Sequence, residues 1–180
     1  MSLPGVQHIW HDKFIDYMDL TKSERLRSNV WEVTSTRFKS AVIAKFAVFP
    51  WEIAYLEAET VAYQWIHGKD IGPRFLGHLT EEGRVIGFLI EQIPNARRAG
   101  PSDLSSCQEA LARLHCLGIR HGDLNRHNNL ICDGRATLID FDGAQTCRDQ
   151  DDLKQEFDSL PERLMDDSGL GGNEVMSDCS

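Results

Sequence analysis

The stretch that most constrains the fold lies late in the chain, where two short apolar runs flank an Asp-Gly pair. The runs are NLI and ATLI, and Asp133 and Gly134 lie between them. Asp-Gly between apolar runs is a strong short-range signal for a β-hairpin with a two-residue turn. With the turn at this pair, Leu130 faces Thr137 across the hairpin.

The open end of this predicted hairpin carries oxygen-bearing side chains. In the same register Asn128 lies opposite Ile139, one residue from Asp140, and cross-strand neighbours are ~5 Å apart. An amide oxygen and a carboxylate are thereby brought together. This pair suits Mg²⁺, which prefers one or two protein carboxylates with phosphates and water completing its octahedron. Asp123 lies in the loop leading to this end and can reach it without being a ligand.

Polar ends are ordinary features of surface hairpins, and any one of these signals alone favours that ordinary interpretation. The joint pattern is more specific. H-x-D-x-x-x-x-N runs from His121 to Asn128, an apolar hairpin follows, and D-F stands at Asp140 and Phe141. Over residues 28–145 the chain resembles the protein-kinase-like superfamily, whose signatures are a catalytic loop with this spacing and D-F-G. The H-G-D and D-F-D forms are more similar to aminoglycoside and choline phosphotransferases, and the surrounding sequence to lipopolysaccharide- and Rio-type kinases.

This resemblance implies an α+β, protein-kinase-like two-lobed fold. A small antiparallel-sheet N-lobe would carry one helix, and the C-lobe would be truncated and mostly helical. The resemblance also implies ATP and Mg²⁺ as cofactors. Asp123 would orient the attacking hydroxyl and accept its proton, and Asn128 and Asp140 would hold the metal against the phosphates. His121 would brace the loop.

The resemblance also demands a lysine on an inner strand and a glutamate on the following helix. Lys45 ends the run AVIAK, and Ile43 shares its face. On the helix predicted over residues 51–68, Glu59 falls among apolar residues, whereas Glu57 shares its side with polar ones as well. A carboxylate on an apolar face is costly to bury alone, so we expect Glu59 to pair with Lys45. The alternative is an exposed Glu59 on a helix that packs by its other side.

The last strand of the front sheet is expected over residues 87–93. By the family's order along the chain, backbone groups near Glu91 and Ile93 would hydrogen-bond adenine. This assignment requires no particular side chain.

Three departures from the family pattern matter. No glycine lies between Ser23 and Ala41, so the glycine-rich loop that covers the phosphates is missing, which favours a non-catalytic relative. Gly122 replaces the arginine that pairs with a phosphorylated activation segment. Asn125 stands where protein kinases usually carry a lysine, and the adjacent Arg126 is a candidate for that charge.

Charge and composition limit the partners. The net charge of −9 is concentrated in residues 149–180, whose ten acidic and two basic residues give −8. The rest is almost neutral without a basic stripe, so we expect no nucleic acid partner.

No apolar run approaches the ~18 residues of a membrane helix, and the start lacks the pattern of a secretory signal. Five cysteines without C-x-x-C fit free thiols in a reducing compartment. We therefore expect no membrane partner and a cytoplasmic location.

The remaining elements follow from periodicity and from helix-end signals. We expect two β-runs in residues 30–49, a hairpin in 74–93, a helix over 107–118 opened by a capping box of Ser106 and Glu109, and a helix over 151–164 interrupted at Pro161. The domain prediction is an N-lobe over residues 1–94 that covers the nucleotide, a reduced C-lobe over 95–168 with the catalytic loop and the metal-binding hairpin, and an acidic flexible tail over 169–180.

The hypothesis that follows is a phosphotransferase that moves the γ-phosphoryl group of ATP, with Mg²⁺, to a hydroxyl of a small molecule or of an exposed protein side chain. A kinase-like module that binds nucleotide or a partner without turnover stays open as the alternative. A metal hydrolase using His115, His121, His127 and the aspartates is a third interpretation, although the spacing of the histidines matches no zinc signature.

Overall fold

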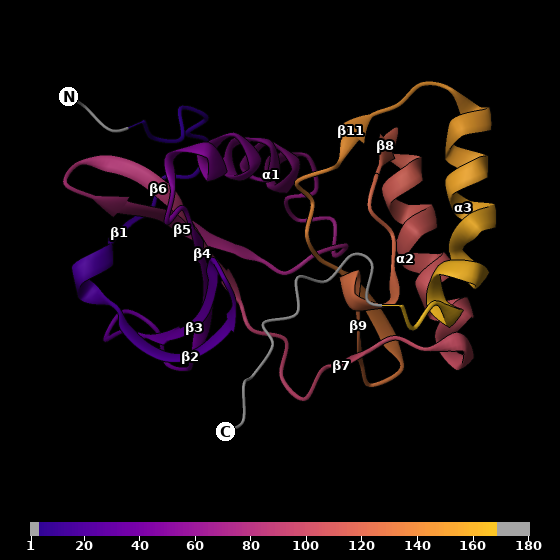
Figure 1. Ribbon diagram of the computed structural model, residues 1–180, viewed down its shortest axis with the longest axis horizontal. Coiled ribbons are helices and arrows are strands. Elements are labelled where there is room, and N and C mark those ends of the chain that lie inside the picture. The colour runs from indigo at the N-terminus through magenta and orange to yellow at the C-terminus, as the bar shows by residue number, and fades with distance from the viewer. Residues whose placement is uncertain (1–3, 169–180) are drawn as a thin grey trace.

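The computed structural model describes residues 4–168, which form two lobes of mixed α+β structure. In Figure 1 the large sheet and helix α1 (Ile53–Trp65) form one lobe, and helices α2 (Leu104–Cys116) and α3 (Gln150–Met165) form the other. The predicted fold class is confirmed. The predicted tail, residues 169–180, lies outside the described residues.

The N-lobe is built on a six-stranded sheet with the order β1-β5-β6-β4-β3-β2. The strands are β1 (Phe14–Asp16), β2 (Thr21–Arg27), β3 (Val30–Thr34), β4 (Val42–Phe46), β5 (Phe75–Glu81) and β6 (Arg84–Glu91). The sheet is antiparallel except that β1 runs parallel to β5. The predicted antiparallel sheet is present, and β1 adds one parallel pairing at its edge, where no hairpin fixes the strand direction.

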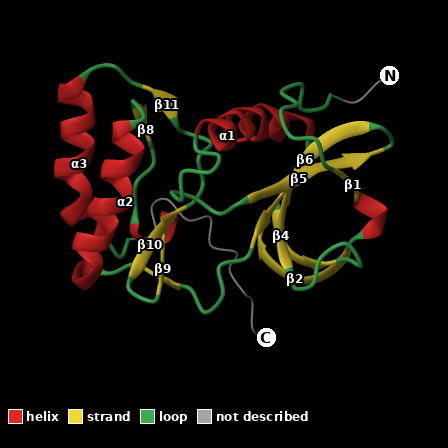
Figure 2. Cartoon of the chain, turned by 180° about the vertical axis from the view of Figure 1, so that it is seen from behind, coloured by secondary structure: helices red, strands yellow, loops and turns green. Residues whose placement is uncertain are grey.

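The C-lobe combines the two helices with short strands. These are β7 (Arg97–Arg98), β8 (Ile119–Arg120), β9 (Asn129–Cys132), β10 (Arg135–Leu138) and β11 (Gln145–Thr146). Figure 2 shows β9 and β10 between the helix pair and the N-lobe. Four short 3-10 turns complete the described elements: Tyr17–Asp19, Pro50–Glu52, Pro101–Asp103 and Arg126–Asn128.

The hydrophobic core continues from one lobe into the other. Buried Tyr63 and Phe88 of the N-lobe belong to the same cluster as Leu111, Leu138 and Phe141 of the C-lobe. A second buried cluster, which includes Val33 and Leu89, covers the other face of the sheet. Because the first cluster crosses the predicted boundary at residue 94, the division of the chain into domains stays a prediction.

The Asp-Gly hairpin forms in the predicted register. Asp133 and Gly134 have φ values of 49° and 75°, which is the backbone of the two-residue turn that favours Asp-Gly. Leu130 pairs with Thr137. The backbone amide of Ile139 donates to the carbonyl of Asn128 at 3.0 Å, so the pairing extends to the residue before Asp140.

Two helix predictions were wrong in detail. Helix α2 begins at Leu104 and not after Ser106, because Pro101 and Asp103 already form a helical turn in which the Asp103 carboxylate accepts the amide hydrogen of Gly100 at 2.8 Å. The Ser106 hydroxyl instead donates to the carbonyl of Gly134 at 2.7 Å.

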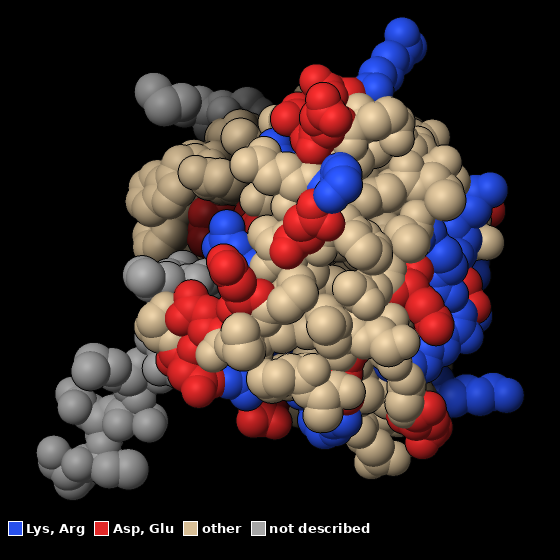
Figure 3. Space-filling view, turned by 90° about the vertical axis from the view of Figure 1, so that its right-hand side faces the viewer, with Lys and Arg blue, Asp and Glu red and all other residues tan. Residues whose placement is uncertain are grey.

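Helix α3 continues through Pro161 without interruption. Leu160 and Leu164 are fully buried on either side of the proline. Their packing holds the last turn although Pro161 cannot donate a backbone hydrogen bond. Figure 3 shows the side of the molecule on which α3 lies, where acidic and basic side chains are interspersed with uncharged ones.

None of the helices within residues 4–168 combines the length and the apolar character that a bilayer-spanning helix requires.

Candidate active site

A buried ion pair joins the sheet to its helix. Lys45 on β4 places its ammonium nitrogen 2.6 Å from Oε2 of Glu59 on α1, and the Glu59 side chain is only 2% exposed. Glu57 instead accepts the backbone amide hydrogen of Gln7 at 2.7 Å. The contact predicted from the helical pattern is therefore present. Of the apolar residues predicted to surround Glu59, four are buried and Tyr55 is 61% exposed; the four are Leu56, Ala62, Tyr63 and Ile66.

Asp140 brings the C-lobe into the same charge network. Its Oδ1 lies 3.1 Å from the Lys45 ammonium, and its Oδ2 pairs with the guanidinium of Arg27 at the end of β2. Glu59 also accepts the backbone amide hydrogen of Phe141 at 3.2 Å. One lysine and one glutamate thus hold the D-F segment against the sheet.

The charges of this network depend on one another. Burial raises the pKa of the Glu59 carboxyl to about 6, and the Lys45 ammonium limits that rise. Burial alone would lower the pKa of Lys45, but the carboxylates of Glu59 and Asp140 hold it above its ordinary value. Burial opposes ionisation of Asp140 too, yet Lys45 and Arg27 keep its pKa below the usual range.

Asp123 and Asn128, both predicted to lie in the catalytic loop, are in contact in the structure. The Asn128 side-chain amide donates to the carbonyl of Asp123 at 2.9 Å and to its Oδ2 at 3.2 Å. Asn125 forms a small cap, its Oδ1 accepting the amide hydrogens of His127 at 2.8 Å and of Asn128 at 3.1 Å. Asp123 is itself exposed. The loop therefore fixes a solvent-facing carboxylate from behind.

The donor set fits a magnesium ion. Oδ1 of Asn128 is buried and has no hydrogen-bond partner, and Asp140 directly follows Ile139, whose backbone amide donates to the Asn128 carbonyl. A buried amide oxygen without a partner is costly, so this atom is suited to a ligand. Within residues 4–168 no three His, Cys, Asp or Glu side chains gather into a metal-holding cluster. A metal here needs phosphate and water to complete its shell, which is the habit of Mg²⁺.

His121 is locked in one neutral form. Its Nδ1 accepts the backbone amide hydrogen of Asp123 at 3.3 Å, and its Nε2 donates to the carbonyl of Ile139 at 3.0 Å. Burial lowers its pKa. With His121 bracing the loop and His115 bonded to Glu156, two of the three histidines of the hydrolase interpretation make structural contacts.

Glu156 of α3 holds the loop by its backbone, and the sequence analysis missed it. The carboxylate accepts the amide hydrogens of His121 at 3.0 Å and of Gly122 at 2.8 Å, and it meets the His115 ring at 2.7 Å. Burial would raise the pKa of Glu156, but these three groups hold it below its usual range. Its signal was available, because Glu156 lies among the buried leucines of α3 as Glu59 lies among the apolar residues of α1.

Gly122 lies where no other residue fits. Its φ is +86°, and a Cβ atom there would lie 2.3 Å from the carbonyl oxygen of Gly143. The loop and the segment after Asp140 therefore touch through their backbones. The glycine in H-G-D is a requirement of this close approach.

Asp140 itself has a left-handed backbone with φ of +60°. Such a conformation is uncommon outside glycine and, where the surroundings impose it, marks a functional-site candidate. Here Lys45 and Arg27 hold the side chain, and the Glu59 carboxylate holds the next backbone amide.

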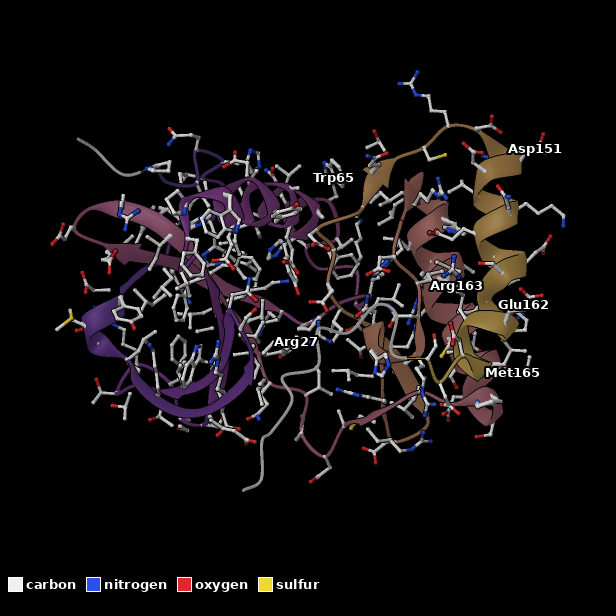
Figure 4. All side chains as sticks on the ribbon, viewed as in Figure 1. Arg27, Trp65, Asp151, Glu162, Arg163 and Met165 are labelled. Carbon is white, nitrogen blue, oxygen red and sulfur yellow. The ribbon has the colours of Figure 1, made fainter. Side chains whose placement is uncertain are left out.

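A cleft of about 380 Å³ opens between the lobes. Its lining includes all five residues predicted to bind the nucleotide: Ile43, Lys45, Glu59, Glu91 and Ile93. Asp140 and Arg27 border it as well, and Figure 4 shows Arg27 between the two lobes. The volume lies within the ordinary range of small-molecule sites. The binding roles of these residues stay predictions.

Arg126, the predicted substitute for the lysine that kinases carry in this loop, points to another part of the chain. Arg126 pairs with Asp167 beyond the end of α3. Arg27, which no sequence signal singled out, is the arginine that reaches Asp140. In the structure Arg27 stands at the end of β2, next to the tight turn Ser28-Asn29.

Comparison with known proteins finds a local similarity. No protein-family model matches the chain. The probable bifunctional tRNA threonylcarbamoyladenosine biosynthesis protein of Methanoculleus marisnigri is 46% identical over 46 residues. The match covers 26% of this chain and 9% of that protein. The chain is thus a partial homologue that spans less than a tenth of the relative's length.

Replacing Lys45 by methionine should destabilise the fold in a pH-dependent way. Without the ammonium the folded-state pKa of Glu59 rises further above its reference value of 4.5, so stability is retained below that value and lost as the pH rises. We expect a loss of about 3–5 kcal/mol at high pH. Urea unfolding at pH 5 and pH 8 measures it. The double variant K45M/E59Q is the control and should lose the pH dependence; equal losses for K45M at both pH values would contradict the pairing.

Replacing Gly122 by alanine should cost more stability than the same change at Gly134. Both have positive φ, and left-handed strain alone costs about 1–2 kcal/mol. A Cβ at Gly134 meets no atom within 4 Å, whereas at Gly122 it collides with a carbonyl. Thermal unfolding of G122A and G134A compares the two. Equal losses would contradict the close approach of the loop to Gly143.

Proposed function

We propose that this chain is an ATP- and Mg²⁺-dependent phosphotransferase acting on a hydroxyl group. The observation that carries the proposal is the convergence in one cleft of the Lys45–Glu59 pair with Asp140. The buried, unpartnered amide oxygen belongs to Asn128, whose backbone pairs with Ile139, the residue before Asp140. Catalysis of phosphoryl transfer consists mainly of positioning and electrostatic stabilisation. It uses a lysine that contacts the phosphates, together with a carboxylate and an amide that hold the metal.

Each residue then has a role set by its contacts. Lys45 supplies positive charge for nucleotide phosphates, and Glu59 keeps it extended into the cleft. Asn128 and Asp140 offer the oxygens for Mg²⁺, which when bound supplies charge that stabilises the transferring phosphoryl group. Asp123 faces solvent and can accept a hydrogen bond, and then the proton, from an acceptor hydroxyl. Backbone groups of Glu91 and Ile93 at the rim of the cleft are proposed to bind adenine.

The acceptor is proposed to be a small molecule or an exposed protein side chain. Asp123 is exposed, so its carboxylate is reached directly from solvent. The name of the M. marisnigri relative refers to biosynthesis of a modified tRNA nucleoside. Because the match covers 9% of that protein, its name does not identify the acceptor, and we propose no nucleic acid or membrane partner. The free cysteines among residues 4–168 fit the proposed cytoplasmic location.

A kinase-like binding module without turnover is the second candidate. The absence of glycine between Ser23 and Ala41 favours it, because backbone amides in strained turns usually cradle the phosphates.

The Asp123→Asn and Asp140→Asn variants separate these functions. We expect D140N to weaken Mg²⁺-ATP binding at least about tenfold, because it loses a charged ligand. D123N should bind normally and lose turnover. Thermal shift with Mg²⁺-ATP and a slow ATP-consumption assay with a panel of hydroxyl acceptors measure both. Binding without any turnover would support the binding module, and no nucleotide binding would refute both candidates.

A further inference from the structure

The β2–β3 hairpin lies where a kinase-like fold carries its phosphate-covering loop, and the inference below rests on the proposed function. Arg27 ends β2 and pairs with Val30 of β3, so the turn consists of Ser28 and Asn29 alone. A turn this short without glycine offers little backbone freedom. Coverage of phosphates by a flexible glycine loop is therefore unavailable to this chain.

Side chains and neighbouring strands hold the hairpin in place. The Arg25 guanidinium donates to the carbonyl oxygens of Arg27 and Ser28, each at 3.2 Å. The backbone amide of Phe46 on β4 donates to the carbonyl of Asn29 at 3.1 Å. The pairing of β2 with β3 shifts register between Arg25 and Arg27, and such irregularities redirect side chains. The position from which Arg27 reaches across the cleft is thereby fixed.

Both oxygens of the Asp140 carboxylate contact a cation. Lys45 lies at Oδ1 and Arg27 at Oδ2. A metal ion that binds this carboxylate competes with these two cations for its negative charge. Lys45 is tied to Glu59 at 2.6 Å and its side chain is 13% exposed, whereas the Arg27 side chain is 24% exposed and has no second carboxylate partner among the described residues. Arg27 is therefore held by fewer partners than Lys45.

We propose that Arg27 is a phosphate-binding residue that replaces the glycine-rich loop by a side chain. In this structure it neutralises Asp140. When a divalent metal takes the carboxylate, the guanidinium passes to the nucleotide phosphates beside it, which it can bind with two parallel hydrogen bonds. The two positive charges of Lys45 and Arg27 balance the two negative charges of Glu59 and Asp140. Metal binding to Asp140 therefore frees a positive charge where the triphosphate arrives.

This exchange predicts opposite effects on two ligands. The variant Arg27→Gln should bind Mn²⁺ alone several-fold more tightly, because the competing guanidinium is gone. It should bind ATP in the presence of Mn²⁺ about tenfold more weakly, because a charged hydrogen-bond donor is lost. Binding of adenosine should not change. Isothermal titration of the full chain with Mn²⁺, ATP and adenosine measures all three.

Arg37→Gln is the matched control. Arg37 belongs to the same lobe and pairs on the surface with Asp19 at 3.4 Å, so its loss removes one charge without touching the cleft. Arg27→Lys is the conservative variant and should recover part of the ATP affinity. Circular dichroism verifies that each variant is folded.

The outcomes separate this inference from the proposed function. If the unaltered chain binds ATP and R27Q behaves as R37Q does, the role of Arg27 is refuted and the proposed function stands. If R27Q binds both Mn²⁺ and ATP more tightly, Arg27 is an inhibitory plug and the inference is also refuted. If the unaltered chain binds no nucleotide, both proposals fail together.

Discussion

The buried contact among Lys45, Glu59 and Asp140 is the constraint on which the rest of the structure depends. It joins a strand, a helix and the segment that follows the C-lobe hairpin, three parts far apart in sequence. Each member is costly to bury alone, so each is stable there only while the others are present. A network of this kind contributes little net stability, but it specifies which elements meet and at what orientation. The position of the cleft between the lobes follows from how these elements meet.

A second buried carboxylate fixes the backbone of the loop that carries Asp123. Glu156 accepts two successive amide hydrogens at His121 and Gly122, while Asn125 caps the turn that follows. The exposed Asp123 thus stands on a loop whose backbone donors are largely satisfied from the protein side. Such a loop would need little reorganisation on ligand binding, which is the preorganisation that the proposed phosphoryl transfer requires.

How much could be predicted from the sequence depended on whether the signal was local. The Asp-Gly turn fixes its own register, so the placement of Asn128 beside Asp140 followed from a few residues. The Lys45–Glu59 contact followed from one helical wheel, because an isolated carboxylate on an apolar face requires a cation. Strand β2 was missed because its residues are exposed and charged and therefore show no alternation. Arg27 was missed with it, since its partner lies more than a hundred residues away and is brought near only by the folded sheet. The continuity of α3 through Pro161 was unpredictable because burial of Leu160 and Leu164 is a tertiary effect.

The core shared by the two lobes has a mechanical consequence. Rotating one lobe away from the other would expose side chains such as Tyr63, Leu138 and Phe141, at a cost of about 1.5–3 kcal/mol for each large residue. The backbone bond from Leu138 to the carbonyl of Ile71 would break as well. Opening the cleft by rotating one lobe is therefore costly. Access to the cleft then depends on side chains at its rim, such as Arg27, whose side chain is 24% exposed, and not on slow domain closure.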